Sequence, residues 1–113
     1  MATLANFKGW TGAERRASLR KTNAAIAAGI IPRPCKCEIC GQAKGIIQYH
    51  NEDYSDPIKY LRQLCWRCHM CLYSSRRAPE VVQKYFDDVR AGKHWPAVYK
   101  HDFAILAKDH GIK

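Results

Sequence analysis

The chain lacks a long apolar run. No stretch approaches the ~20 residues that a membrane-spanning helix requires, and residues 1–10 are too short and too mixed in character for a secretory signal. Internal repeats and low-complexity tracts are also absent. We therefore expect a cytoplasmic protein. In that reducing compartment its 6 cysteines are better suited to binding metal than to forming disulfides.

Acidic residues are scarce. The 10 Asp and Glu residues stand against 19 Lys and Arg residues, which leaves a formal charge of +9. Such an excess favours a polyanionic partner, of which nucleic acid is the commonest, although the charge could also serve solubility alone. A membrane surface fits less well, because no basic helix carries a large bulky apolar face.

With 113 residues, of which 47% are hydrophobic, the sequence predicts a single domain with a small core. We divide it into a basic helix and linker at 1–34, a metal-binding core at 35–77 and C-terminal helices at 78–113. A bound metal would supply stability that apolar burial in so short a chain does not.

The first of these parts is expected to be helical. Thr11 and Glu14 form a capping box, and the Ala-rich stretch after them predicts a helix to about Ala28, ended by Gly29. Cations crowd the outer side of this helix and are candidate phosphate contacts: Arg15, Arg16, Arg20 and Lys21.

The remaining elements give an α+β fold. Residues 45–50 and 60–64 read as strands, and a helix follows from about Cys68. A helix beginning near Pro79 carries a core-facing stripe until Gly92. A last helix at about 99–109 is expected to turn Phe103, Leu106 and Ala107 toward the same core.

Two Cys-x-x-Cys pairs dominate the middle of the chain. Cys37 with Cys40, and Cys65 with Cys68, have the pattern of a four-thiolate zinc site, because each pair forms half of a tetrahedral sulfur shell on one tight turn. Two further cysteines are surplus. Cys35 could compete with Cys37 as a ligand, and Cys71 could face the core.

Zinc binding would bring the end of the first strand beside the start of the helix, so His50 and His69 could lie close together. A neutral imidazole can accept a proton or bind a metal near pH 7. The acidic residues Glu52 and Asp53 lie just after His50 in the sequence.

Residues from 37 to about 77 resemble the HNH nucleases of the ββα-metal, or His-Me finger, superfamily, in particular the small phage and bacterial type with a zinc ribbon. The segments that carry the resemblance are Leu64-Cys65-Trp66-Arg67-Cys68-His69 and His50-Asn51-Glu52-Asp53-Tyr54-Ser55-Asp56-Pro57. The resemblance implies a small ββα-metal core with a zinc ribbon, flanked here by N- and C-terminal helices, in a bacterial or phage-infected cell.

The activity implied by this resemblance is metal-dependent hydrolysis of DNA phosphodiester bonds. His50 would activate a water, and His69 would help to bind a catalytic Mg²⁺ or Mn²⁺, with Ni²⁺ as a further option at a histidine ligand. Asp53 or Glu52 would supply an oxygen ligand.

A second register of the motif makes His50 the metal ligand and places Asn51 at the position of the base. His69 could also be a zinc ligand or a helix cap, and Tyr73 stands where relatives often have another histidine. Asp53 could instead bond turn amides.

Arg67, Arg76 and Arg77 flank the expected metal helix and are further candidate phosphate contacts. DNA is the expected partner, with RNA as a second candidate. One active site per chain predicts a nick, so a double-strand cut needs a homodimer or two visits. The alternatives are a zinc-ribbon nucleic-acid-binding module whose nuclease activity has decayed, and a redox-sensing zinc protein.

Overall fold

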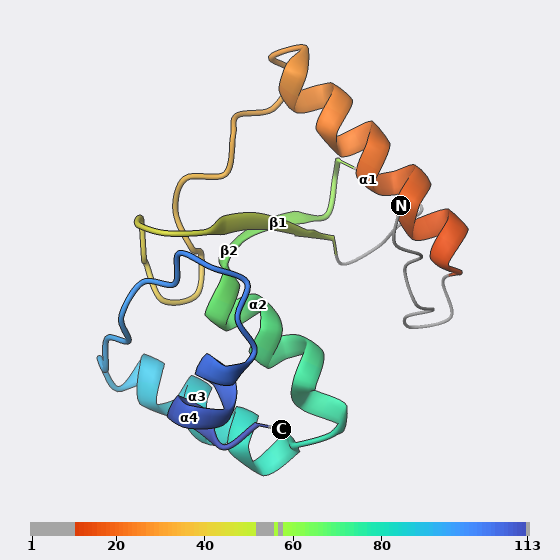
Figure 1. The fold of residues 1–113 in the computed structure, drawn as a ribbon. Coiled ribbons are helices and arrows are strands. Elements are labelled where there is room, and N and C mark those ends of the chain that lie inside the picture. Colours follow the sequence, from red (N-terminus) through yellow and green to blue (C-terminus); the bar gives the residue numbers. More distant parts are fainter. Residues whose placement is uncertain (1–10, 52–55, 57, 113) are drawn as a thin grey trace. The chain divides into compact units, whose positions relative to one another are not determined.

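The computed structural model describes residues 11–51, 56 and 58–112 (Figure 1). The chain forms two compact units. The first comprises Met1–Arg33 and His50–Arg62, and the second comprises Pro34–Tyr49 and Gln63–Lys113.

The expected α+β class is confirmed. Two short strands pair as an antiparallel sheet, and helices precede and follow them. No helix in the described part of the chain is both long and apolar enough to cross a membrane. In chain order the elements are α1 (Gly12–Ala27), β1 (Ile47–Asn51), β2 (Leu61–Cys65), α2 (Trp66–Tyr73), η1 (Ser74–Arg76), α3 (Pro79–Arg90) and α4 (Ala104–His110).

Helix α1 belongs to the first unit and begins as the sequence predicts. The Thr11 hydroxyl accepts from the backbone N–H of Glu14 at 3.1 Å, and the Glu14 carboxylate accepts from the N–H of Thr11 at 3.0 Å. This reciprocal capping box satisfies two backbone donors at the helix start. The side chains that α1 buries are small: Ser18, Thr22 and Ala25.

The second unit holds the apolar core. Leu64 and Trp66 are almost fully buried there, together with Val82 and Tyr85 of α3. Helix α3 contacts α2, η1 and α4, and Pro79 occupies its first turn, where a missing N–H costs nothing. The core-facing stripe expected on this helix is therefore confirmed.

Two helix boundaries differ from the sequence-based expectation. Helix α2 begins at Trp66 rather than near Cys68, because the sulfur of Cys65 caps it. Helix α4 begins only at Ala104, after a turn in which Asp102 Oδ1 accepts from the Ala104 N–H at 3.0 Å. Phe103, expected in the core, is 63% exposed as a result.

Candidate metal centre

The first cysteine pair lies on a tight knuckle. The Cys40 N–H points at the Cys37 sulfur at 3.5 Å, and the Gly41 N–H donates to the Cys37 carbonyl at 3.0 Å. Gly41 has φ +79°, a left-handed conformation that glycine adopts without a Cβ penalty. The glycine after the cysteine pair thus has a conformational reason to be there.

The second pair straddles the junction of β2 and α2. Cys65 is the N-cap of α2, and its sulfur accepts from the Cys68 N–H at 3.4 Å. The N-terminal end of a helix favours negative charge, so the capping arrangement suits a thiolate. Backbone N–H groups therefore face a sulfur in both halves of the site.

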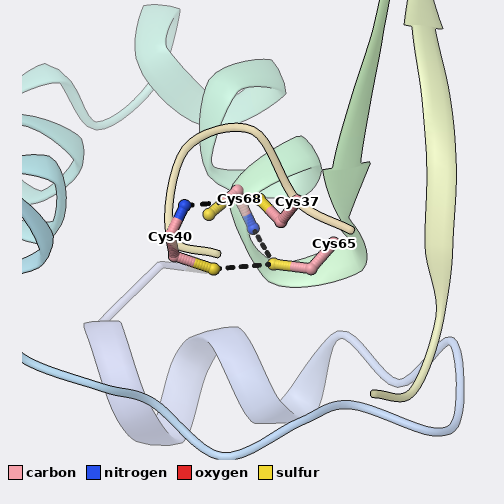
Figure 2. Close-up of side chains that lie close together, drawn as sticks. All are labelled: Cys37, Cys40, Cys65 and Cys68. Atoms are coloured by element: carbon pink, nitrogen blue, oxygen red, sulfur yellow. Dashed lines mark hydrogen bonds between the residues drawn. The ribbon is translucent and has the colours of Figure 1, made fainter. Parts of the chain in front are cut away.

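The four cysteine sulfurs lie within 4.8 Å of one another (Figure 2). The sulfurs of Cys40 and Cys65, which come from different halves, are 3.7 Å apart. A tetrahedral zinc ion with Zn–S bonds of about 2.3 Å would place its sulfurs about 3.8 Å apart. All 6 cysteines are free thiols, and the cluster can bind a metal ion such as zinc.

The thiols of the cluster differ in pKa. Hydrogen bonds from the thiols of Cys40, Cys65 and Cys68 lower the pKa of Cys37 far below its usual value. The pKa of Cys68 is raised, first by its hydrogen bond to Cys37. Neighbouring thiolates repel one another in the absence of a cation, so metal binding here is coupled to proton release.

Tyr85 contacts the cluster from α3. Its hydroxyl lies 3.0 Å from the Cys68 sulfur, and its side chain is 2% exposed. Burial raises the pKa of Tyr85, so the phenol keeps its proton and can donate to the Cys68 sulfur. Sequence reasoning placed Tyr85 only in the core, because helical periodicity does not reveal where a hydroxyl points.

The sequence also offered no sign that Gln63 on β2 binds the first knuckle. Its side-chain oxygen accepts from the N–H of Cys35 at 2.7 Å, and its carbonyl accepts from the N–H of Glu38 at 2.8 Å. The Glu38 carboxylate in turn accepts from the Gln63 N–H. These bonds fasten the first knuckle to β2, the strand that ends in the second cysteine pair.

Backbone hydrogen bonds of Ile46 join the segment before β1 to Val98 and to the first residue of α2. Ile46 donates to the Val98 carbonyl at 2.8 Å, and the Trp66 N–H donates to Ile46 at 3.0 Å. A Cβ on Gly45 would lie 2.4 Å from the Val98 oxygen, and Gly45 has φ +73°. Only glycine therefore fits at this position without a backbone shift.

The two candidate catalytic histidines belong to different units. His50, in the first unit, is 4% exposed, and its neighbour Asn51 donates to the Ser18 hydroxyl of α1 at 2.9 Å. His69, in the second unit, lies with Nδ1 2.9 Å from Gln48 Oε1. Glu52 and Asp53 lie outside the described residues, so the catalytic arrangement stays a prediction.

Three of the seven candidate phosphate contacts are exposed. Arg20, Lys21 and Arg77 are exposed, whereas Arg15 and Arg16 are half-buried. The side chain of Arg76 lies outside the described part of the structure.

Arg67 requires a correction. It is 4% exposed and pairs with Asp109 at 2.9 Å, and it donates to the Pro96 carbonyl at 3.1 Å. Because these bonds hold the guanidinium inside the fold, Arg67 is not a candidate phosphate contact.

Within the described residues, the four cysteines are the only cluster of three or more potential metal ligands.

No family model matches the chain, and neither the curated proteins nor the solved structures contain a match.

Proposed function

We propose that the protein is a metal-dependent DNA endonuclease of the HNH type, in which the four cysteines hold a structural zinc ion. The observation that carries the proposal is the order β1, β2, α2 combined with the four-sulfur cluster at the junction of β2 and α2. His50 is the penultimate residue of β1, and His69 lies near the start of α2. This is the arrangement that the resemblance to HNH nucleases implies.

In this proposal His50 is the general base. An imidazole can take a proton from water at neutral pH. The bond from Asn51 to Ser18 supports the role, because it ties the end of β1 to α1 within the first unit. Asp53 or Glu52 would supply the oxygen ligand of the catalytic cation.

His69 is the proposed ligand for a catalytic Mg²⁺ or Mn²⁺. An amide oxygen only accepts hydrogen bonds, so the contact with Gln48 Oε1 puts the proton of a neutral ring on Nδ1. The lone pair then lies on Nε2, the form of imidazole that binds metals. The cation itself would polarise the phosphate and stabilise the departing oxygen.

The basic face of α1 supports a DNA substrate. Arg20 and Lys21 are exposed, Arg16 is partly so, and the whole chain carries +9. An enzyme that cuts the backbone must hold a polyanion beside its cation. Binding should therefore weaken steeply as the salt concentration rises.

A plasmid-nicking assay with Mg²⁺ or Mn²⁺ tests the proposal. We expect His50→Ala and His69→Ala each to slow nicking at least about 100-fold. His94 is exposed in a loop of the second unit, so His94→Ala is the matched control and should cut normally. Zinc content and circular dichroism of every variant verify the fold. Absence of metal-dependent nicking in the wild type, or normal nicking in both histidine variants, would refute the nuclease.

The alternative is a nucleic-acid-binding module without nuclease activity. One observation favours it: the His69 ring packs on Tyr73 of the same helix, with 5.0 Å between centroids. Such a contact would also hold a purely structural histidine. DNA binding without cleavage, unchanged by His50→Ala, would identify the module.

A further inference from the structure

Two large aromatic side chains stand in solvent on the turn before α4. Tyr99 and Phe103 are 68% and 63% exposed, whereas Trp66 and Tyr85 of the same unit are almost fully buried. Exposed aromatic groups leave apolar surface in water and often mark interaction sites. The turn between Tyr99 and Phe103 is therefore a candidate binding surface.

The backbone of this turn is anchored on both sides. Val98 and Leu106 flank it and belong to the core, with 6% and 2% exposure. Inside the turn, the Asp102 N–H donates to the Lys100 carbonyl at 2.9 Å, while the Asp102 carboxylate accepts from Ala104. An anchored turn presents its side chains with little entropy left to lose on binding.

The buried Trp66 side chain contacts two rings of this turn. The Phe103 ring meets the buried indole of Trp66 at 5.4 Å and an interplanar angle of 63°. The His101 ring meets the same indole at 6.1 Å and 80°. Phe103 is thus braced on one side, while most of its surface remains accessible to a ligand.

Two lysines lie near the two rings in the sequence, beside the Asp102 carboxylate that accepts from the Ala104 N–H. Lys100 lies between the rings in the sequence and is exposed, as is Lys108 on α4. Stacking on aromatic rings combined with lysine contacts to phosphates is how proteins bind single nucleic-acid strands. A protein-docking patch has instead an apolar centre that is poor in charge.

We propose that the turn of residues 99–103 binds unpaired bases of a DNA strand, which stack on Tyr99 and Phe103 while Lys100 contacts a phosphate. The choice of DNA rests on the proposed nuclease function. The surface would favour substrates with single-stranded or distorted segments over regular duplex, because paired bases do not offer their faces for stacking.

The test is fluorescence anisotropy of the zinc-loaded full chain with a labelled single-stranded oligonucleotide and with the corresponding duplex, without a catalytic cation. Tyr99→Ala and Phe103→Ala should each weaken single-strand binding about 10-fold and leave duplex binding nearly unchanged. Ile30→Ala is the control, because it removes an apolar side chain of similar exposure, 69%, from the other unit.

Two further variants separate stacking from general apolar contact. Phe103→Trp should retain the affinity, whereas Phe103→Leu should bind as weakly as Phe103→Ala, since leucine keeps apolar area but has no aromatic face. Wild-type affinity in both alanine variants or in Phe103→Leu would overturn the proposal. Tighter binding of an RNA strand of the same sequence would overturn the choice of DNA.

Binding here is measured without cleavage. A protein that cuts no DNA can still pass this test, so failure of the nuclease proposal is seen separately, in the nicking assay.

Discussion

Arg67 and Asp109 form an ion pair, with 2.9 Å between Nη1 and Oδ2, that joins the segment between two cluster cysteines to the C-terminal helix α4. Arg67 follows Cys65 by two residues and precedes Cys68 directly. Its guanidinium also lies 5.4 Å from the Trp95 ring centre. The ion pair therefore links the C-terminal helix to the segment that carries the second cysteine pair.

Breaking this pair should destabilise the second unit. Asp109→Asn leaves the Arg67 cation buried without its counter-charge, and we expect a loss of about 3 kcal/mol in the free energy of unfolding. Asp88→Asn is the matched control. That carboxylate is 29% exposed, close to the 26% of Asp109, but its partner Lys84 is 76% exposed. Urea denaturation of both variants gives the comparison, and equal losses would show that the buried pair contributes nothing special.

Metal removal should unfold the second unit. Four sulfurs from two separate segments meet at the cluster, and without a cation their thiolates repel one another, so the fold and the metal are coupled. Treatment with a zinc chelator is expected to abolish the cooperative thermal transition seen by circular dichroism.

Cys37→Ser should likewise reduce bound zinc and lower the melting temperature. Cys35→Ser is its control, because Cys35 is exposed and outside the cluster. A chelated protein that still melted cooperatively at the original temperature would contradict a structural role for the metal.

Tyr85→Phe should weaken metal binding without unfolding the protein. The substitution removes only the hydroxyl that lies 3.0 Å from the Cys68 sulfur. Loss of such an outer hydrogen bond typically costs 10- to 100-fold in metal affinity, roughly the decrease we expect. Competition with a chromophoric zinc chelator measures it. Tyr99→Phe removes an exposed hydroxyl as the control, and the same affinity in both variants would rule out a contribution from the Tyr85 hydroxyl.

His110 should make stability depend on pH. Burial, followed by the nearby charge of Arg67, lowers the pKa of His110 from 6.5 to about 4. The unfolded chain therefore binds the proton more readily than the folded one, so this contribution to stability is complete above pH 6.5 and is lost as the pH falls toward 4.

The comparison is with His110→Asn, because acid also protonates the cluster thiols in both proteins. The variant should show a shallower fall of unfolding free energy between these pH values. Parallel curves for the two proteins would contradict the assignment.

Much of the fold followed from local chemistry. The capping box at Thr11 and the stripe through Val82 and Tyr85 were both found where the sequence predicts them. The sequence misplaces the starts of two helices, α2 and α4, which have unusual caps. A cysteine sulfur caps α2, and an aspartate turn delays α4, and neither signal is strong in a sequence.

Arg67 shows the limit most clearly. A cation beside a metal motif in a chain with charge +9 suggests phosphate binding. Its buried guanidinium pairs instead with Asp109, 42 residues further along the chain. No local pattern connects the two residues.

By itself the sequence identified the four cysteines that meet in one cluster, because two Cys-x-x-Cys pairs are the spacing of a four-thiolate site. Only the tertiary structure decided what surrounds those cysteines. The Tyr85 hydroxyl contacts the Cys68 sulfur, and the Gln63 side chain accepts from the backbone of Cys35. Arg67, which lies between two of the cysteines, pairs with Asp109 of α4. Each of these contacts joins segments that are distant in the sequence. Such contacts depend on how elements pack in three dimensions, and packing leaves no periodic trace in the order of the residues.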